Sequence, residues 1–106
     1  MKERANLNYI EKLSGGDKAF QVKLIGIIKS EFPEEVRIYH DNLKSNNYEL
    51  AASNVHKIKH KISILGLEKG YGIAEEFEND LHRNDTHLSN EFNEILESIF
   101  SFLDTL

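Results

Sequence analysis

The segment Ala51–Gly66 reads AASNVHKIKHKISILG and has apolar residues at a regular helical spacing. Intervals of four, three, four and three residues separate Ala51, Val55, Ile58, Ile62 and Leu65. This period predicts an α-helix with one buried stripe. Gly66 directly follows the last apolar residue, where a glycine in the left-handed conformation commonly ends a helix. We therefore expect Gly66 to have a structural role as a C-cap.

Two helices are expected before this segment. The first is short and ends at Ser14-Gly15-Gly16, because two adjacent glycines weaken a helix. Asp17 is a suitable N-cap for a long second helix, which we expect to continue through Pro33 with a kink. Ser45-Asn46-Asn47 forms the next break, and an asparagine there is available as N-cap for the helix that carries the stripe from Ala51 to Leu65. The apolar stripes of the first two helices consist of Leu7, Ile10, Leu13, Phe20, Leu24, Ile27, Ile28, Phe32, Val36, Tyr39 and Leu43.

Two further helices are expected after Gly66. One should end near Asn84-Asp85, and the last has six apolar positions at heptad spacing. Four substantial helices with short connections predict an all-α protein, an antiparallel four-helix bundle with the short N-terminal helix as a cap. We expect five aromatic residues to lie in its core rather than to form a cofactor site: Tyr39, Phe77, Phe92, Phe100 and Phe102. The apolar positions of these two helices are Ile73, Ala74, Phe77, Leu81, Leu88, Phe92, Ile95, Ile99, Phe102 and Leu106.

The composition narrows the functional classes. With 106 residues the chain has material for one core, so we expect a single domain over residues 1–106. It has no cysteine, which excludes disulfides and thiolate zinc sites. Its net charge of −5 argues against nucleic acid as the main partner. We found no apolar run long enough for a membrane helix and no signal-peptide pattern, so we expect a soluble cytoplasmic protein.

His56 is the residue with the most distinctive chemistry. At 100° per residue it lies beside the buried stripe, toward the surface, and Lys59 and His60 share its face. Ala52 and Ser63 extend this face one turn before and two turns after it. The ammonium groups expected around the imidazole belong to Lys57, Lys59 and Lys61.

This arrangement suits the capture of a phosphoryl group. Imidazole is largely neutral at pH 7 and offers a lone pair, and nearby lysines disfavour its protonated form. A lysine also stabilises the negative charge of the phosphoryl oxygens. On the residues alone, however, a histidine on a helix surface is usually just a solvated residue, and lysines beside it usually form a solvated face.

The spacing from His56 through Ile58 and Lys59 to Leu65-Gly66 resembles the signature of histidine-containing phosphotransfer domains, the intermediates of multistep phosphorelays. The resemblance extends over roughly residues 7–105, because other segments also resemble that family. These segments are Ser14-Gly15-Gly16-Asp17, Phe20, Phe32-Pro33 and Ala74-Glu75-Glu76-Phe77-Glu78. Two positions depart from the pattern: His60 stands where the family usually has glycine, and Lys61 where it often has serine.

The resemblance implies a function. A receiver domain with an aspartyl phosphate, or a hybrid histidine kinase, would dock over the helix and supply Mg²⁺. Nε2 of His56 would attack the phosphorus, and Lys59 would stabilise the phosphoryl group. The resulting phosphohistidine would then transfer this group to another receiver. Partner-binding positions would be Ala52, Lys57, His60 and Ser63. We expect a free-standing, monomeric carrier with no kinase activity and no metal or cofactor of its own.

Two alternatives stay open. The first is an adaptor that docks receivers without transferring phosphate, because a bulky His60 could hinder the approach to His56. The second is a metal site on the i, i+4 pair His56 and His60, with a further ligand from His40, His82 or His87. The acidic run Glu75-Glu76-Phe77-Glu78 is expected to be a solvated helix face rather than an acid–base site.

Overall fold

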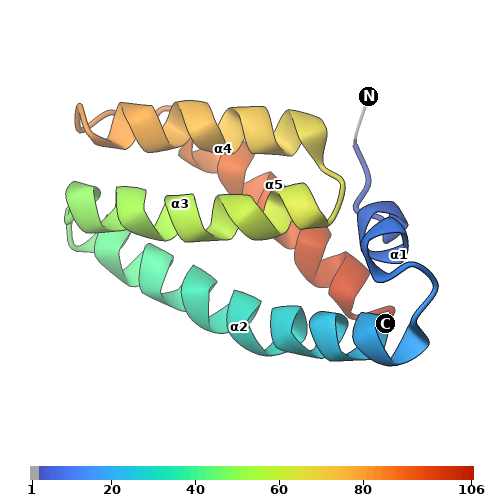
Figure 1. Cartoon of the computed structure of the whole chain (residues 1–106). Helices are drawn as coiled ribbons and strands as arrows, with labels where there is room; N and C mark the ends of the chain where they lie inside the picture. Colours follow the sequence, from blue (N-terminus) through green and yellow to red (C-terminus); the bar gives the residue numbers. More distant parts are fainter. Residues whose placement is uncertain (1–2) are drawn as a thin grey trace.

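Residues 3–106 fold into five α-helices without any β-strand, and these are the residues that the computed structural model describes. The all-helical prediction is therefore confirmed for this part of the chain. The helices, coloured along the sequence in Figure 1, are α1 (Asn8–Ser14), α2 (Lys18–Lys44), α3 (Tyr48–Ile64), α4 (Glu68–Leu81) and α5 (Ser89–Leu103).

Helix α2 begins and continues as its sequence predicts. The side chain of Asp17 accepts a hydrogen bond from the backbone N–H of Phe20 at 3.2 Å, which caps the helix. Pro33 lies inside a single uninterrupted helix, whose ribbon changes direction along its length (Figure 1). Asn47 occupies the N-cap position of α3, but its side chain makes no capping hydrogen bond.

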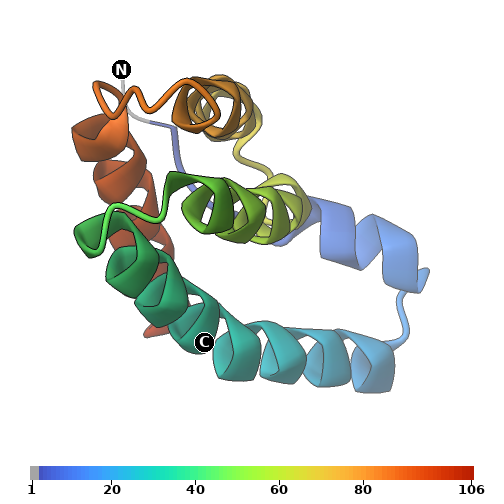
Figure 2. The same ribbon diagram turned by 90° about the vertical axis from the view of Figure 1, so that its left-hand side faces the viewer.

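Helix α3 lies between α2 and α4, as Figures 1 and 2 show from two directions. It contacts both neighbours extensively, and α4 in turn contacts α5. Helix α3 therefore buries side chains on two sides, and this wide buried arc determines which residues around His56 reach the surface. Its buried residues are Ala51, Ala52, Val55, Ile58, Lys59 and Ile62.

Aromatic side chains fill the centre of the core. Tyr39, Phe77 and Phe92 are each fully buried. The ring centroid of Tyr39 lies 5.2 Å from that of Phe92, and Phe77 lies 5.3 Å from Phe92. Aromatic rings in tilted arrangements at these separations attract one another beyond simple area burial. The prediction that these aromatic residues form the core is confirmed.

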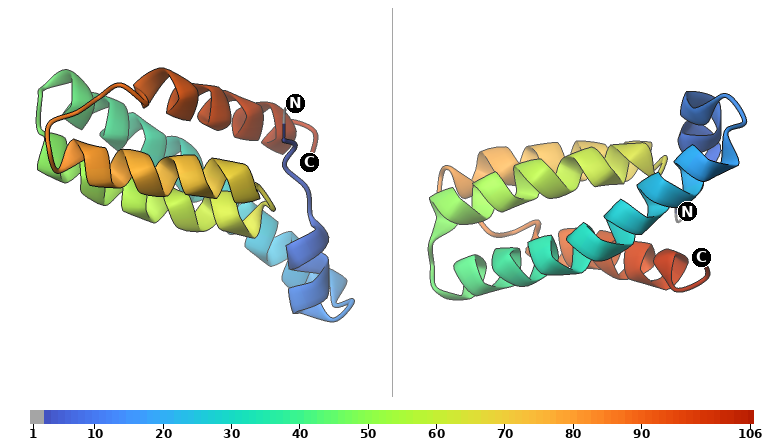
Figure 3. Two further views of the ribbon diagram at one scale, coloured as in Figure 1. Left: turned by 90° about the horizontal axis from the view of Figure 1, so that it is seen from above. Right: turned by 60° about the horizontal axis from the view of Figure 1, so that its bottom comes forward.

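The beginning of α2 is less covered than its apolar sequence predicts. Helix α1 packs at this end of the molecule (Figure 3) and buries Ile10, but Leu13 remains 53% exposed. Phe20 and Ile27 of α2 are 39% and 42% exposed. With only seven residues, α1 is too short to cover the apolar stripe of this part of α2.

Gly66 ends α3 as expected, with φ at +79°. The N–H groups of Gly66 and Leu67 donate to the carbonyls of Ser63 and Ile62, the pattern of a Schellman motif. The N-terminal segment packs onto this turn, because the N–H of Asn6 donates to the carbonyl of Leu65 at 2.9 Å.

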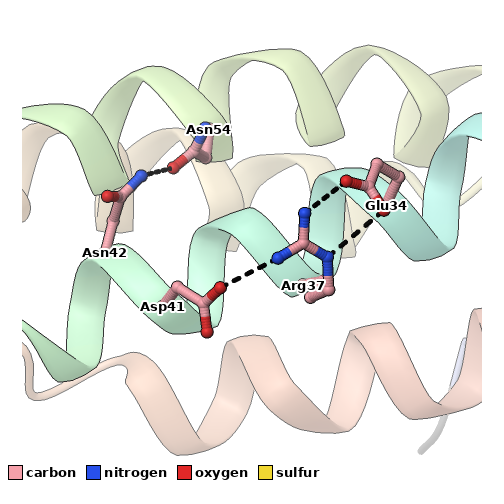
Figure 4. A network of polar contacts seen from close by, with 5 residues as sticks. All are labelled: Glu34, Arg37, Asp41, Asn42 and Asn54. Atoms are coloured by element: carbon pink, nitrogen blue, oxygen red, sulfur yellow. Dashed lines mark hydrogen bonds and ion pairs between the residues drawn. The ribbon is translucent and has the colours of Figure 1, made fainter.

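Polar contacts also join the helices. Asn42 of α2 donates from Nδ2 to Oδ1 of Asn54 on α3 at 2.6 Å, as Figure 4 shows. On α2 itself, Arg37 forms ion pairs with Glu34 and Asp41 (Figure 4). The Arg37 pairs are exposed, so they contribute little to stability.

Within the described part of the chain, none of the helices combines the length and the apolar character needed to cross a membrane.

Candidate functional site

His56 projects from the outer side of α3 and contacts α4. Its side chain is 52% exposed, and its Nδ1 lies 3.1 Å from Oε2 and 3.3 Å from Oε1 of Glu78. A carboxylate accepts hydrogen bonds, so this contact assigns the ring proton to Nδ1. The lone pair is then on Nε2.

Lys59 lies beneath this contact rather than on the exposed face. Its side chain is only 9% exposed, and Nζ lies 3.0 Å from Oε1 of Glu78. The ammonium also lies 5.5 Å from the centre of the Tyr71 ring, within the range of a cation–π interaction. Glu78 therefore contacts His56 through both oxygens, more closely through Oε2, and Lys59 through Oε1.

The ion pair keeps Lys59 charged. Removal from water lowers the pKa of Lys59, but its hydrogen bond and charge interaction with Glu78 outweigh this effect. Tyr71 and Glu75 act in the same direction, and the net result is a raised pKa. The burial itself follows from helix geometry, because Lys59 stands four residues after Val55 and three before Ile62, both fully buried.

His60 is exposed and lies beside His56. The two ring centroids are 5.0 Å apart and the rings are nearly perpendicular, at 88°. The expectation that His56 and His60 share one face is confirmed. His60 therefore narrows the approach to His56 from one side.

Lys61 points away from His56, contrary to expectation. Its Nζ lies 2.9 Å from Oε2 of Glu35 and 3.1 Å from Oε1 of Glu31, and its side chain is 12% exposed. Burial lowers the pKa of Lys61, and the contacts with Glu35 and Glu31 outweigh this and raise it. Lys61 thus joins α3 to α2 and contributes no ammonium group to the surroundings of His56.

The remaining predicted partner-binding positions divide into two groups. Lys57 and Ser63 are exposed on α3 and accessible to a partner. Ala52 is 1% exposed, so the expectation that it extends the exposed face is wrong. It lies three residues before Val55 and falls within the buried arc of α3.

Glu78 is the site residue that sequence reasoning missed. Its side chain is only 18% exposed, so the expectation of a solvated face is wrong at this position. The available signal was its place between the buried residues Phe77 and Leu81. Pairing it with His56 requires the register of α4 against α3, which the sequence does not give.

The histidines proposed as further metal ligands are engaged elsewhere. Nδ1 of His82 lies 3.1 Å from Oε1 of Glu49, and Nδ1 of His87 lies 2.9 Å from Oδ1 of Asp85. His40 packs against the ring of Tyr39 with centroids 5.0 Å apart. In residues 3–106, none of the three joins His56 and His60 in a group of ligand atoms close enough for one metal ion.

Comparison with known protein families found no match, and neither curated proteins nor solved structures matched the chain.

Proposed function

We propose that this protein is a phosphorelay carrier in which His56 accepts a phosphoryl group from a receiver-domain aspartate and passes it to another receiver. The observation that carries the proposal is the contact of Glu78 with Nδ1 of an exposed His56. It orients the imidazole and leaves the Nε2 lone pair for the phosphorus. Surface histidines without such a partner sample several ring orientations and both neutral tautomers.

The phosphoryl transfer needs no proton donor. Nε2 of His56 forms the N–P bond while the O–P bond of the aspartyl phosphate breaks, and the aspartate leaves as a carboxylate. The imidazole keeps the hydrogen on Nδ1 and gains a positive charge, which the carboxylate of Glu78 stabilises. Mg²⁺ bound by the receiver would neutralise the phosphoryl oxygens during transfer.

The surrounding residues take separate roles in this proposal. Lys59 is a positioning residue that holds Glu78, and Lys57, His60 and Ser63 form the surface that meets the receiver. We infer that α2 to α5 form an antiparallel four-helix bundle, with α1 as its cap, and that this scaffold presents α3 to a partner. The carrier would act in the cytoplasm and would have no kinase activity of its own.

The test is incubation with a phosphorylated receiver domain and Mg²⁺, followed by intact-mass measurement. We expect wild type to gain one acid-labile phosphoryl group and His56→Gln to gain none. His82→Gln is the matched control, because His82 is also half-exposed and also contacts a glutamate of a neighbouring helix at 3.1 Å. Undiminished phosphorylation of His56→Gln would overturn the assignment.

A second function, that of an adaptor that docks receivers without transfer, is favoured by one observation. The His60 ring lies beside His56, where the family resemblance leads one to expect a glycine. If wild type stays unphosphorylated and His60→Gly becomes phosphorylated, His60 blocks transfer and the adaptor function holds. Phosphorylation of wild type excludes it.

A further inference from the structure

A second cluster of chemically active side chains lies at the end of α4 and the loop before α5. Asp80, Asp85 and His87 each direct one ligand atom into the same small volume, and these atoms all lie within 4.8 Å of one another. Asp80 belongs to a different side of α4 from Glu78, because residues two positions apart on a helix are about 200° apart. This cluster is therefore separate from the His56 site.

The distances suit a tetrahedral metal ion. Nδ1 of His87 lies 2.9 Å from Oδ1 of Asp85 and 3.6 Å from Oδ2 of Asp80. With bonds of about 2.0–2.2 Å to Zn²⁺, neighbouring ligand atoms of a tetrahedron are about 3.4 Å apart. Shifts of less than about 1 Å would bring these two pairs to this separation. The third pair, between Asp80 and Asp85, lies within 4.8 Å.

The buried carboxylate of Asp80 is an independent observation that points to a ligand. Its side chain is only 5% exposed. Arg83 donates to Oδ1 at 2.7 Å, but Oδ2 is buried and accepts no hydrogen bond from any residue in the range 3–106. Buried carboxylate oxygens are normally hydrogen-bonded or coordinate a metal. Oδ2 is also the oxygen that faces His87.

The backbone holds the cluster in place. The N–H of Asp85 donates to the carbonyl of Asp80 at 2.9 Å, and the N–H of His87 donates to Oδ1 of Asp85 at 3.0 Å. Asn84 has a left-handed conformation, with φ at +59°, which turns the chain back toward α4. The loop thus fixes two ligands against the third before any ion binds.

We propose that Asp80, Asp85 and His87 bind a divalent transition-metal ion, with Zn²⁺ as the best-suited ion and water completing the coordination. Carboxylate oxygen and imidazole nitrogen are both ligands of Zn²⁺, and open zinc sites combine three protein ligands with a water. The imidazole disfavours Mg²⁺ and Ca²⁺, which prefer oxygen ligands. The metal would replace the proton that His87 shares with Asp85, and Arg83 would keep Oδ1 of Asp80 while Oδ2 binds the ion.

The test is a calorimetric titration of the full chain with ZnCl₂. We expect one saturable site per chain in wild type and at least a tenfold weaker Kd in His87→Ala. The side chain of His87 is 61% exposed, so its removal should not unfold the protein. Asp85→Asn is a second variant on the same loop and should weaken binding as well. His82→Ala is the control for exposed histidines and should bind as wild type does.

The outcomes separate this site from the other histidines. Retained zinc binding in the double variant His56→Gln/His60→Gln supports the proposal. Loss of zinc binding in this double variant assigns the ion to His56 and His60 on α3 and overturns the proposal. The absence of saturable binding in wild type, or wild-type affinity in His87→Ala, also overturns it. As a second readout, Co²⁺ should give the intense visible absorption of tetrahedral coordination in wild type, and His87→Ala should lose it.

Discussion

Nδ1 of His56 lies 3.1 Å from Oε2 of Glu78, so a residue of α4 orients a histidine that α3 carries. The other oxygen of the same carboxylate lies 3.0 Å from the buried ammonium of Lys59. One carboxylate therefore connects the stability of the helix pair with the orientation of the imidazole. Changes at Glu78 should alter both.

Glu78→Ala tests this connection. It should slow phosphorylation of His56 by a receiver about tenfold, the lower end of the loss seen when a metal-bound histidine loses the carboxylate that orients it. It should also lower the free energy of unfolding by about 3 kcal/mol, because Lys59 is left buried without its partner. Receiver-dependent phosphorylation rates and urea denaturation measure the two effects.

The control is Glu76→Ala, at an exposed position of the same helix, which should change neither the phosphorylation rate nor the free energy of unfolding. Wild-type transfer by Glu78→Ala would show that the contact does not orient His56 for reaction.

The two lysines on either side of Lys59 should behave differently from each other. Lys61→Ala should lower the free energy of unfolding by about 2 kcal/mol, because Glu35 has a side chain only 20% exposed and loses its partner. Phosphorylation should continue at the wild-type rate, since Lys61 points toward α2. Lys57→Ala should stay within about 0.5 kcal/mol of wild type in urea denaturation, because Lys57 is exposed. Equal effects of the two substitutions on stability would contradict the bridging role of Lys61.

Features of the fold that depend on local chemistry could be predicted from the sequence. The carboxylate of Asp17 caps α2 because the cap needs only a short side chain and the next three residues. Gly66 ends α3 because only the backbone conformation at that residue matters. The exposure of His56 also follows from its angular position relative to the apolar stripe of α3 alone. None of these predictions needs the position of a second helix.

Features that depend on how helices pair could not be predicted in this way. Lys59, Lys61 and Ala52 were all expected near the exposed face, and each is turned toward a neighbouring helix. A single apolar stripe indicates one buried side, but α3 packs against both α2 and α4. The contact of Glu78 with His56 depends on the same pairing. The periodicity of apolar residues shows which side of a helix is buried. It does not show how wide the buried arc is, or in which register one helix packs against the next.

Gly66→Ala tests the turn between α3 and α4. We expect it to lower the free energy of unfolding by about 1–2 kcal/mol, because φ is +79° and L-residues rarely adopt this conformation. The added Cβ would also lie 2.6 Å from Nδ2 of Asn6, which must move. Gly72→Ala is the matched control within α4, where the new Cβ would have no atom within 4 Å apart from its chain neighbours and the nearby backbone of the helix itself. Gly72→Ala should raise the free energy of unfolding by about 0.5–1 kcal/mol. Urea denaturation should therefore show that the two substitutions change this free energy in opposite directions. A loss of stability in both variants would assign the effect to something other than the left-handed turn.

Tyr39→Phe tests the centre of the core and its response to pH. The hydroxyl of Tyr39 is buried without a hydrogen-bond partner in residues 3–106, so its removal should raise the free energy of unfolding by about 1 kcal/mol at pH 7. Burial also raises the pKa of Tyr39 well above the ordinary value of tyrosine. The folded chain then keeps a proton that the unfolded chain releases above about pH 10, so wild type should lose stability as the pH rises past this point.

The Phe variant lacks this proton. Its advantage over wild type should therefore widen by up to about 1.4 kcal/mol for each pH unit above 10, as long as Tyr39 stays protonated in the folded chain. Urea denaturation of both proteins between pH 7 and pH 11 measures the difference, and other alkaline groups cancel because both proteins contain them. A constant difference between Tyr39→Phe and wild type across this range would mean that the Tyr39 hydroxyl ionises as readily in the folded chain as in the unfolded one.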